Sequence, residues 1–356
     1  MSRLSEATSV DLVEEYVRMI GSDRIPEVPV ISQALIRDDD PLFKYNCAAA
    51  DYLCSRGLNE CQNYTLKDSS KQALLYAGSE LLKLANPLTS DQDSLRASLI
   101  DGLLDAAATN LSNANGFFGF FENGEIFRPD ASGEISELSA TAFALVSGAS
   151  ETSWREPARP DFYAAKRLVC DLLSILGVDA GRLNFSQVEG EPVWEAGFAA
   201  GCGSEKREGF RVRFGAVSVA HLRGRGIDKT VWAGEISFRP DVAGRKKSAE
   251  KFKAFPSFPP SSRDLAVIVE DSEPAKNVSD EIVKIAGQKT KGKGFELESC
   301  SIFDIYRGKG VPEGFKSLAC ALRFRSGEKT LQTEEVNGVF DAICQELSKK
   351  RKLRAQ

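Results

Sequence analysis

The stretch IFDIYRGKGVPEGFKSLACALRFR, residues 302–325, places two apolar segments on either side of a loop rich in glycine and positive charge. Apolar and other residues alternate strictly in the second segment, which predicts a β-strand with one face in a core. The predicted outer face carries small residues and ends in Arg323 and Arg325. The predicted core face consists of Leu318, Cys320, Leu322 and Phe324.

The loop GKGVPEG, residues 308–314, does not have the pattern of a phosphate-binding loop. Its spacing is not GxGxxG, Pro312 lacks an amide donor, and a strand follows where a helix N-terminus is required. The loop instead predicts a β-hairpin connection that carries Arg307 and Lys309. These two cations, with Arg323 and Arg325, are our candidate contacts to a nucleic-acid backbone. For the two strand arginines, a solvated outer sheet face is an alternative interpretation.

The flanking sequence predicts a complete small domain over residues 257–356. Apolar periodicity gives the order β-α-β-β-α-β, which is the ferredoxin-like sandwich. The predicted elements are a strand at 263–270, a helix at 278–287, strands at 299–308 and 315–326, a helix at 333–350 and a short strand at 352–355. Residues 245–256 are predicted to be a linker, because a proline-rich segment leads into the domain.

Residues 28–244 mix helices with strands, which predicts an α+β domain on a largely antiparallel sheet. A helix is expected within 94–112, and another at 161–178 with Asp161 as its N-cap. Strands are expected at 210–220 and 229–240, and Asn123-Gly124 predicts the turn of a hairpin within 117–129. Residues 1–27 hold one short helix, too short to form a domain.

Composition is that of a globular protein. The chain has 356 residues, of which 42% are hydrophobic and 27% charged, enough for two or three domains. The N-terminal residues lack the apolar run of a signal peptide, and nothing in the sequence has the length of a membrane span, so a cytoplasmic location is expected. The eight cysteines form no CxxC pair and His221 is the single histidine, so zinc sites of the usual Cys/His kind are not expected.

Charge is distributed unevenly along the chain. Residues 245–356 hold 22 Lys and Arg against 16 Asp and Glu, a net charge of +6, while residues 1–244 carry −11. A basic module on an acidic body suggests that the C-terminal part meets a polyanion. The alternative is that these cations only solvate a small domain.

Three acids lie near the start of the first predicted helix: Asp11, Glu14 and Glu15. Asp11 and Glu15 are four residues apart and share a helix face, where two carboxylates could hold a hard cation such as Mg²⁺. Acids in a first helical turn are also favourable by themselves, because they meet the positive end of the helix dipole.

Several segments together resemble a known family. Residues 257–356, with FPPSSRDLAVIV, KTLQTEEVN and KLR, resemble the ferredoxin-fold anticodon-binding domain at the C-terminus of the bacterial-type phenylalanyl-tRNA synthetase β subunit. The segments NPLTSDQDSLRASLIDGLL, FFENGEIF and WAGEISF resemble the domain of that subunit which copies the class II synthetase fold without its activity. Residues 1–27 resemble the end of the small domain that precedes it.

The resemblance implies a non-catalytic chain that scaffolds a catalytic α subunit in an (αβ)₂ assembly and binds tRNA-Phe. The α subunit would supply the sites for phenylalanine and ATP. In agreement, Phe127-Arg128-Pro129 lacks the glutamate of the Arg-x-Glu clamp on ATP that a class II active site needs. The family also has a D-x5-D-x-x-E-E array that holds Mg²⁺ with the α subunit; Asp11, Glu14 and Glu15 match three of its positions, and the first falls on Ser5.

The family's β chain begins with a tRNA-binding module and an editing domain, and neither has a counterpart here. We therefore expect the C-terminal half of a β subunit, either as a fragment or as a naturally reduced subunit. An alternative is a standalone RNA-binding or structural paralogue without synthetase activity. An RNA-recognition-motif protein fits less well, because the segment LACALRF lacks the aromatic residues on which bases stack in that motif.

Overall fold

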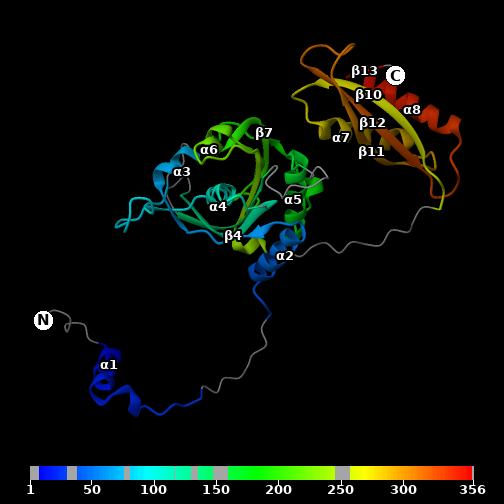
Figure 1. The fold of residues 1–356 in the computed structure, drawn as a ribbon. Coiled ribbons are helices and arrows are strands. Elements are labelled where there is room, and N and C mark those ends of the chain that lie inside the picture. Colours follow the sequence, from blue (N-terminus) through cyan, green and yellow to red (C-terminus); the bar gives the residue numbers. More distant parts are fainter. Residues whose placement is uncertain are drawn as a thin grey trace.

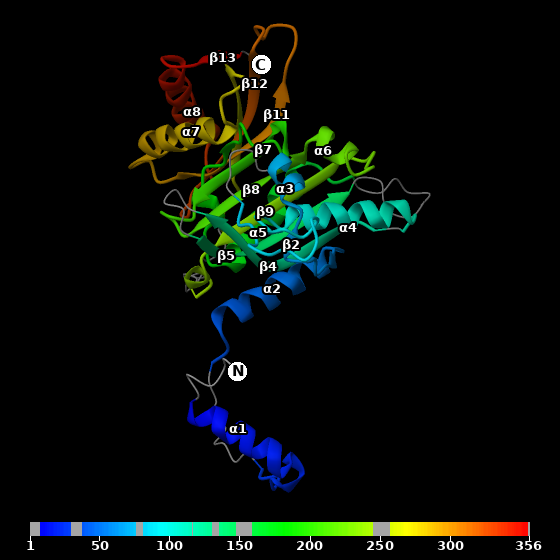
Figure 2. The same ribbon diagram turned by 90° about the vertical axis from the view of Figure 1, so that its left-hand side faces the viewer.

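The computed structural model describes residues 8–29, 38–75, 81–115, 117–129, 135–146, 159–244 and 257–354. In these ranges a seven-stranded sheet and a later four-stranded sheet are each packed against helices (Figures 1 and 2). The chain is thus α+β, as predicted. None of the helices in the described ranges has both the length and the apolar character that crossing a bilayer requires.

The large sheet has the order β1-β4-β5-β9-β8-β7-β6. Every neighbouring pair is antiparallel except β1 and β4. Its strands are β1 (Asn59–Glu60), β4 (Gly119–Pro129), β5 (Ile135–Val146), β6 (Ser186–Gln187), β7 (Trp194–Ser204), β8 (Phe210–Val217) and β9 (Val231–Phe238). A separate pair joins β2 (Leu66–Lys67) to β3 (Ser94–Leu95).

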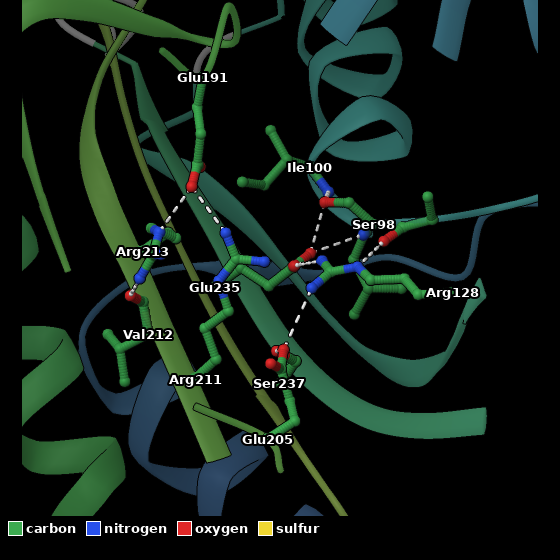
Figure 3. Close-up of polar contacts among 12 residues, drawn as sticks. Ser98, Ile100, Arg128, Glu191, Glu205, Arg211, Val212, Arg213, Glu235 and Ser237 are labelled. Atoms are coloured by element: carbon green, nitrogen blue, oxygen red, sulfur yellow. Dashed lines mark hydrogen bonds and ion pairs between the residues drawn. The ribbon is translucent and has the colours of Figure 1, made fainter. Parts of the chain in front are cut away.

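Helices cover the two faces of the large sheet differently. α2 (Pro41–Ser55) and α5 (Phe162–Ile175) pack on one face, over an apolar cluster to which the strands contribute Phe121 and Phe238 among others. α4 (Ile100–Ser112) packs on the other face over a second apolar cluster. Part of that second face carries charged side chains instead (Figure 3). Short elements complete this part: α3 (Ser69–Leu75), η2 (Ala180–Arg182), α6 (Val219–Arg223) and η3 (Pro240–Val242).

The predicted hairpin at Asn123-Gly124 is wrong, because both residues lie inside the continuous strand β4. The side chain of Asn123 accepts a hydrogen bond from Thr141 on β5. At Gly124 a Cβ atom would come 2.3 Å from the guanidinium of Arg96. Asn123 and Gly124 are therefore strand residues that lie against Thr141 and Arg96, and they form no turn.

Both helices predicted in this region are present, but one begins later. α5 begins after Asp161, whose carboxylate accepts a hydrogen bond from the amide of Ala164 at 2.7 Å, as an N-cap does. The helix expected within 94–112 begins only at Ile100, because Ser94 and Leu95 belong to β3. The predicted strands at 210–220 and 229–240 correspond to β8 and β9.

The C-terminal sheet has the order β11-β12-β10-β13, and the predicted β-α-β-β-α-β succession is confirmed. Both helices pack on one face (Figure 1). The predicted core side chains of β12, Leu318, Cys320, Leu322 and Phe324, are fully buried. The elements are β10 (Ser261–Glu270), α7 (Ala275–Thr290), β11 (Glu296–Tyr306), β12 (Phe315–Arg325), α8 (Thr333–Ser348) and β13 (Lys352–Arg354).

The N-terminal described segment holds α1 (Ser9–Ile20) and the short η1 (Ser22–Arg24). No residue of α1 is buried, and the helix stands apart from both sheets (Figures 1 and 2). The predicted linker at 245–256 and Ser5 lie outside the described residues.

Candidate functional site

The four candidate cations of the C-terminal domain do not form one cluster. Arg307 and Lys309 lie in the connection between β11 and β12, whereas Arg323 and Arg325 lie at the far end of β12. The strand rises about 3.3 Å per residue, so the two pairs are separated by roughly 25 Å. They could bind the same RNA only at two distant points.

Arg323 and Arg325 share one carboxylate, that of Glu298 on β11, at 2.8 Å and 2.9 Å. Arg325 is largely buried and also donates to the carbonyl of Phe258 at 2.7 Å, so it holds the chain just before β10. Arg323 is half exposed on the outer face of the sheet. Of the two, Arg323 is thus the better placed to contact a ligand.

The connection between β11 and β12 is a hairpin loop, as the sequence predicts. Gly308, Gly310 and Gly314 have positive φ values there, a conformation that side chains with a Cβ rarely adopt. The guanidinium of Arg307 is 3.0 Å from the carboxylate of Asp271 and remains mostly exposed. Lys309 is exposed between two of the glycines. The loop therefore presents two cations to solvent, near two acids: Asp271 beside Arg307 and the exposed Glu313 within the loop.

An aromatic and a guanidinium meet over the outer face of the C-terminal sheet. Tyr306 ends β11 and Arg354 ends β13, on opposite edges of the sheet, yet the Arg354 guanidinium carbon is 4.2 Å from the centre of the Tyr306 ring. Their direct neighbours on the two inner strands are small: Ser317 is paired with Tyr306, and Ala266 is paired with Arg354. Sequence reasoning missed this pair, since it depends on the register of β13 against β10.

The polar part of the large sheet is built around two carboxylates, those of Glu235 on β9 and Glu205 in the turn after β7. Arg128 on β4 reaches both, at 2.7 Å and 3.3 Å (Figure 3). Glu235 also accepts hydrogen bonds from the Ser98 hydroxyl and the Leu99 amide. Arg128 therefore has its charge balanced within the chain.

The carboxylate of Glu191, on the same face, is contacted by three donors (Figure 3). Arg211 and Arg213 on β8 lie 2.6 Å and 2.9 Å from one of its oxygens, and the Trp194 indole donates to the other. Burial raises the pKa of Glu191, but the hydrogen bond from Arg213 and the charge of Arg211 outweigh it and leave the pKa below its usual value. A polar hollow of about 420 Å³ lies beside Glu191 and Arg213.

A further ion pair, Arg96 with Glu122, is almost fully buried between the segment before α4 and β4. The two groups are 2.5 Å apart, with 7% and 3% of their side chains exposed. The amide of Asn63 donates to the other Glu122 oxygen at 2.6 Å. Arg96, Arg128, Arg211 and Arg213 thus each lie against a carboxylate of the chain, and Arg211 and Arg213 share that of Glu191. A polyanionic ligand such as ATP would have to displace these carboxylates.

The predicted metal ligands all lie on α1 and are engaged locally. Asp11 accepts hydrogen bonds from the backbone and hydroxyl of Thr8, and these bonds lower the pKa of its carboxyl group. Glu14 and Glu15 both pair with Arg18, at 3.1 Å and 3.4 Å. Across the described ranges, no three His, Cys, Asp or Glu side chains come together as a metal site.

Comparison with known proteins identifies both sheet domains. Residues 25–238 match the family model described as "Phenylalanyl tRNA synthetase beta chain CLM domain". Residues 256–356 match the "Ferredoxin-fold anticodon binding domain". A solved pyrrolysyl-tRNA synthetase from Desulfitobacterium hafniense is 14% identical, with a TM-score of 0.41, over 55% of this chain and 66% of its own.

Curated relatives carry the same family name. The phenylalanine–tRNA ligase beta subunit of Mannheimia succiniciproducens is 30% identical over 95% of this chain and 41% of its own length. That of Yersinia pestis is 30% identical over 98% of this chain and 42% of its own. The chain therefore spans about two fifths of these relatives. With one family model matching more than half of its residues, the chain belongs to the phenylalanyl-tRNA synthetase beta chain family.

Proposed function

We propose that this chain is a non-catalytic portion of the β subunit of phenylalanyl-tRNA synthetase. It scaffolds the catalytic α subunit and binds the anticodon region of tRNA-Phe during ATP-dependent attachment of phenylalanine. The observation that carries the proposal is the C-terminal sheet, whose outer face bears Tyr306, Arg354 and Arg323 and is left open by the helices. The family assignment of residues 256–356 supports it.

On that face, we assign different tasks to different residues. Unpaired bases stack on aromatic rings and on guanidinium planes, which suits Tyr306 and Arg354. Arg307 and Lys309 contact phosphates near one end of the sheet, and Arg323 does so near the other. Arg325 is a candidate contact at the same end as Arg323, although its bond to Phe258 already uses part of its guanidinium.

Catalysis is assigned to the α subunit within an (αβ)₂ assembly in the cytoplasm. Arg128, Arg211 and Arg213 are the cations on the polar face of the large sheet that could meet the phosphates of ATP, and each has a glutamate partner. Their side chains are at most 30% exposed, so a phosphate would have to displace the glutamates at poorly accessible positions, whereas Arg307 and Arg323 are about half exposed beside their acids. The body formed by the large sheet therefore has a structural task.

A Mg²⁺ ion shared with the α subunit is assigned to Asp11, Glu14 and Glu15. Their carboxylates are the hard oxygen ligands that this ion prefers. Arg18 would have to release Glu14 and Glu15, so the α subunit must supply the remaining ligands and draw the two side chains to the ion. If this is right, EDTA weakens the α–β complex, and Asp11→Asn removes the effect of EDTA; equal stability with and without Mg²⁺ contradicts the assignment.

The loop assignment is tested by replacing both of its cations. Arg307→Ala with Lys309→Ala removes two phosphate contacts, so the affinity for tRNA-Phe should fall. The slope of log K against log salt should also become shallower, by about 1 to 2. The measurement is filter binding over a series of salt concentrations.

The matched control is Lys284→Ala in α7 with Lys349→Ala directly after α8, away from the hairpin loop. It removes the same charge from the protein but should leave the slope close to that of the wild type. Equal effects of the two double variants would mean that only net charge matters, and the loop would then not be a contact.

A further inference from the structure

Two backbone carbonyls in the large-sheet part, those of Gly181 and Leu183, are held in place by their own segment. The Gly181 amide donates to the Asp179 side chain at 3.0 Å, which fixes the short helix η2. The side chains of Leu183 and Phe185 pack against the apolar cluster under α5. The two carbonyl oxygens thus form a preorganised acceptor pair, which costs little entropy to use.

Lys276 of the C-terminal domain donates to both of these oxygens. Its ammonium nitrogen is 3.0 Å from the Gly181 oxygen and 2.9 Å from the Leu183 oxygen. The neighbours of Lys276 in α7, Ala275 and Val278, pack into the C-terminal core. Lys276 therefore joins two parts of the chain that are each rigid at the point of contact.

The position of Lys276 within α7 is unfavourable for a cation. It lies in the first turn, where the helix dipole favours negative charge. Of the nearby acids, Glu273 pairs with Arg351 and Asp271 pairs with Arg307, while Asp280 shares the helix face of Lys276 one turn later. The helix dipole thus disfavours a lysine at this position, whereas the two carbonyl oxygens bind its ammonium directly.

The geometry points to Lys276 as a positioning residue that fixes the C-terminal sheet against the body formed by the large sheet. Hydrogen bonds from a charged donor are about twice as strong as neutral ones, and two acceptors define a direction as well as a distance. This contact of Lys276 with the Gly181 and Leu183 oxygens, which we call the latch, goes beyond the proposed function. It rests on that function in one respect, because its purpose is to hold the RNA-facing sheet at a set angle to the body that meets the α subunit.

The test is a distance measurement between the two parts in the full chain. Spin labels on p-acetylphenylalanine at Tyr163 in α5 and Val283 in α7, both exposed positions, leave the native cysteines alone. We expect a narrow distance distribution for the wild type. Lys276→Met should broaden it, with the equilibrium constant for docking reduced at least about tenfold by the loss of two charged hydrogen bonds.

Two matched variants make the result specific. Lys276→Arg keeps the charge and several donors, so it should retain most of the docked population. Lys284→Met removes an exposed lysine from the same helix and should change nothing. A distribution for Lys276→Met as narrow as that of the wild type, or a broad one in the wild type, overturns the latch.

A binding measurement separates the latch from the proposed function. The isolated anticodon stem-loop of tRNA-Phe meets only the outer sheet face, so wild type and Lys276→Met should bind it equally. In the complex with the α subunit, Lys276→Met should raise KM for whole tRNA. If the wild type does not bind the stem-loop, the proposed function fails, while the spin-label distances still decide whether Lys276 docks the two parts.

Discussion

Arg96 shows how single residues shape the large-sheet part. Its guanidinium donates to the carbonyls of Glu125 and Asn63 as well as to the carboxylate of Glu122. A charge removed from water in this way is tolerated only if its partners remain. The absence of a side chain at Gly124 leaves room for the guanidinium against β4.

At this scale we predict that Arg96→Met destabilises the protein by about 3–5 kcal/mol, because it leaves the Glu122 carboxylate buried without its cation. Urea unfolding followed by circular dichroism measures the change. Arg167→Met is the control: its pair with Asp171 is exposed on the arginine side, and such pairs contribute about 0–1 kcal/mol. Equal losses in the two variants would contradict the importance of the buried pair.

The same residues show what a sequence cannot reveal. Asn-Gly is typical of a hairpin turn, because both residues tolerate the backbone of such turns. Here Gly124 leaves room for the guanidinium of Arg96, a residue that is distant in sequence. Local propensity contains no information on that contact, so the predicted turn at Asn123-Gly124 was wrong.

Whole elements were predictable where their signals are local. The N-cap at Asp161 and the strict alternation in β12 correctly placed a helix and a strand. The register between strands was not predictable, because it depends on how distant segments pair. The meeting of Tyr306 with Arg354 therefore became visible only once β13 was seen beside β10.

At the scale of elements, Glu191 connects the segment before β7 to β8 by ion pairs with Arg211 and Arg213. The stability that these ion pairs contribute should depend on pH. The folded pKa of Glu191 lies below its ordinary value of about 4.3, so the folded state binds this proton more weakly than the unfolded chain. The stabilisation is complete well above the unfolded pKa and begins to fall as the pH approaches it. It is lost as the pH falls through the lower folded pKa.

We therefore predict that Glu191→Gln lowers the free energy of unfolding at pH 7, and that its difference from the wild type shrinks between pH 5 and pH 3. Urea titrations at several pH values within the range of the folded protein measure both quantities. Glu189→Gln, an exposed neighbour in the same segment, should show a difference that does not change with pH. A constant difference for Glu191→Gln would contradict the account.

At the scale of the whole molecule, the positive side chains of the two sheets differ in how far they are exposed. Cations of both sheets pair with acids, but those of the large sheet are largely buried with their glutamates, whereas Arg307 and Arg323 are about half exposed at the two ends of the open C-terminal face. The sequence predicted the ferredoxin-like order and the basic character of this part, but not that its four candidate cations form two groups. The groups are apart because most of strand β12 lies between the loop that holds Arg307 and Lys309 and the strand end that holds Arg323 and Arg325.

We propose above all that this chain works as a β-subunit portion together with an α subunit. The most direct measurement is co-expression with the phenylalanyl-tRNA synthetase α subunit of the same organism, followed by sizing and by aminoacylation of tRNA-Phe. We predict a stable complex that attaches phenylalanine to tRNA, while either chain alone does not. Failure of the two chains to associate, or a complex that leaves tRNA-Phe uncharged, would contradict the account.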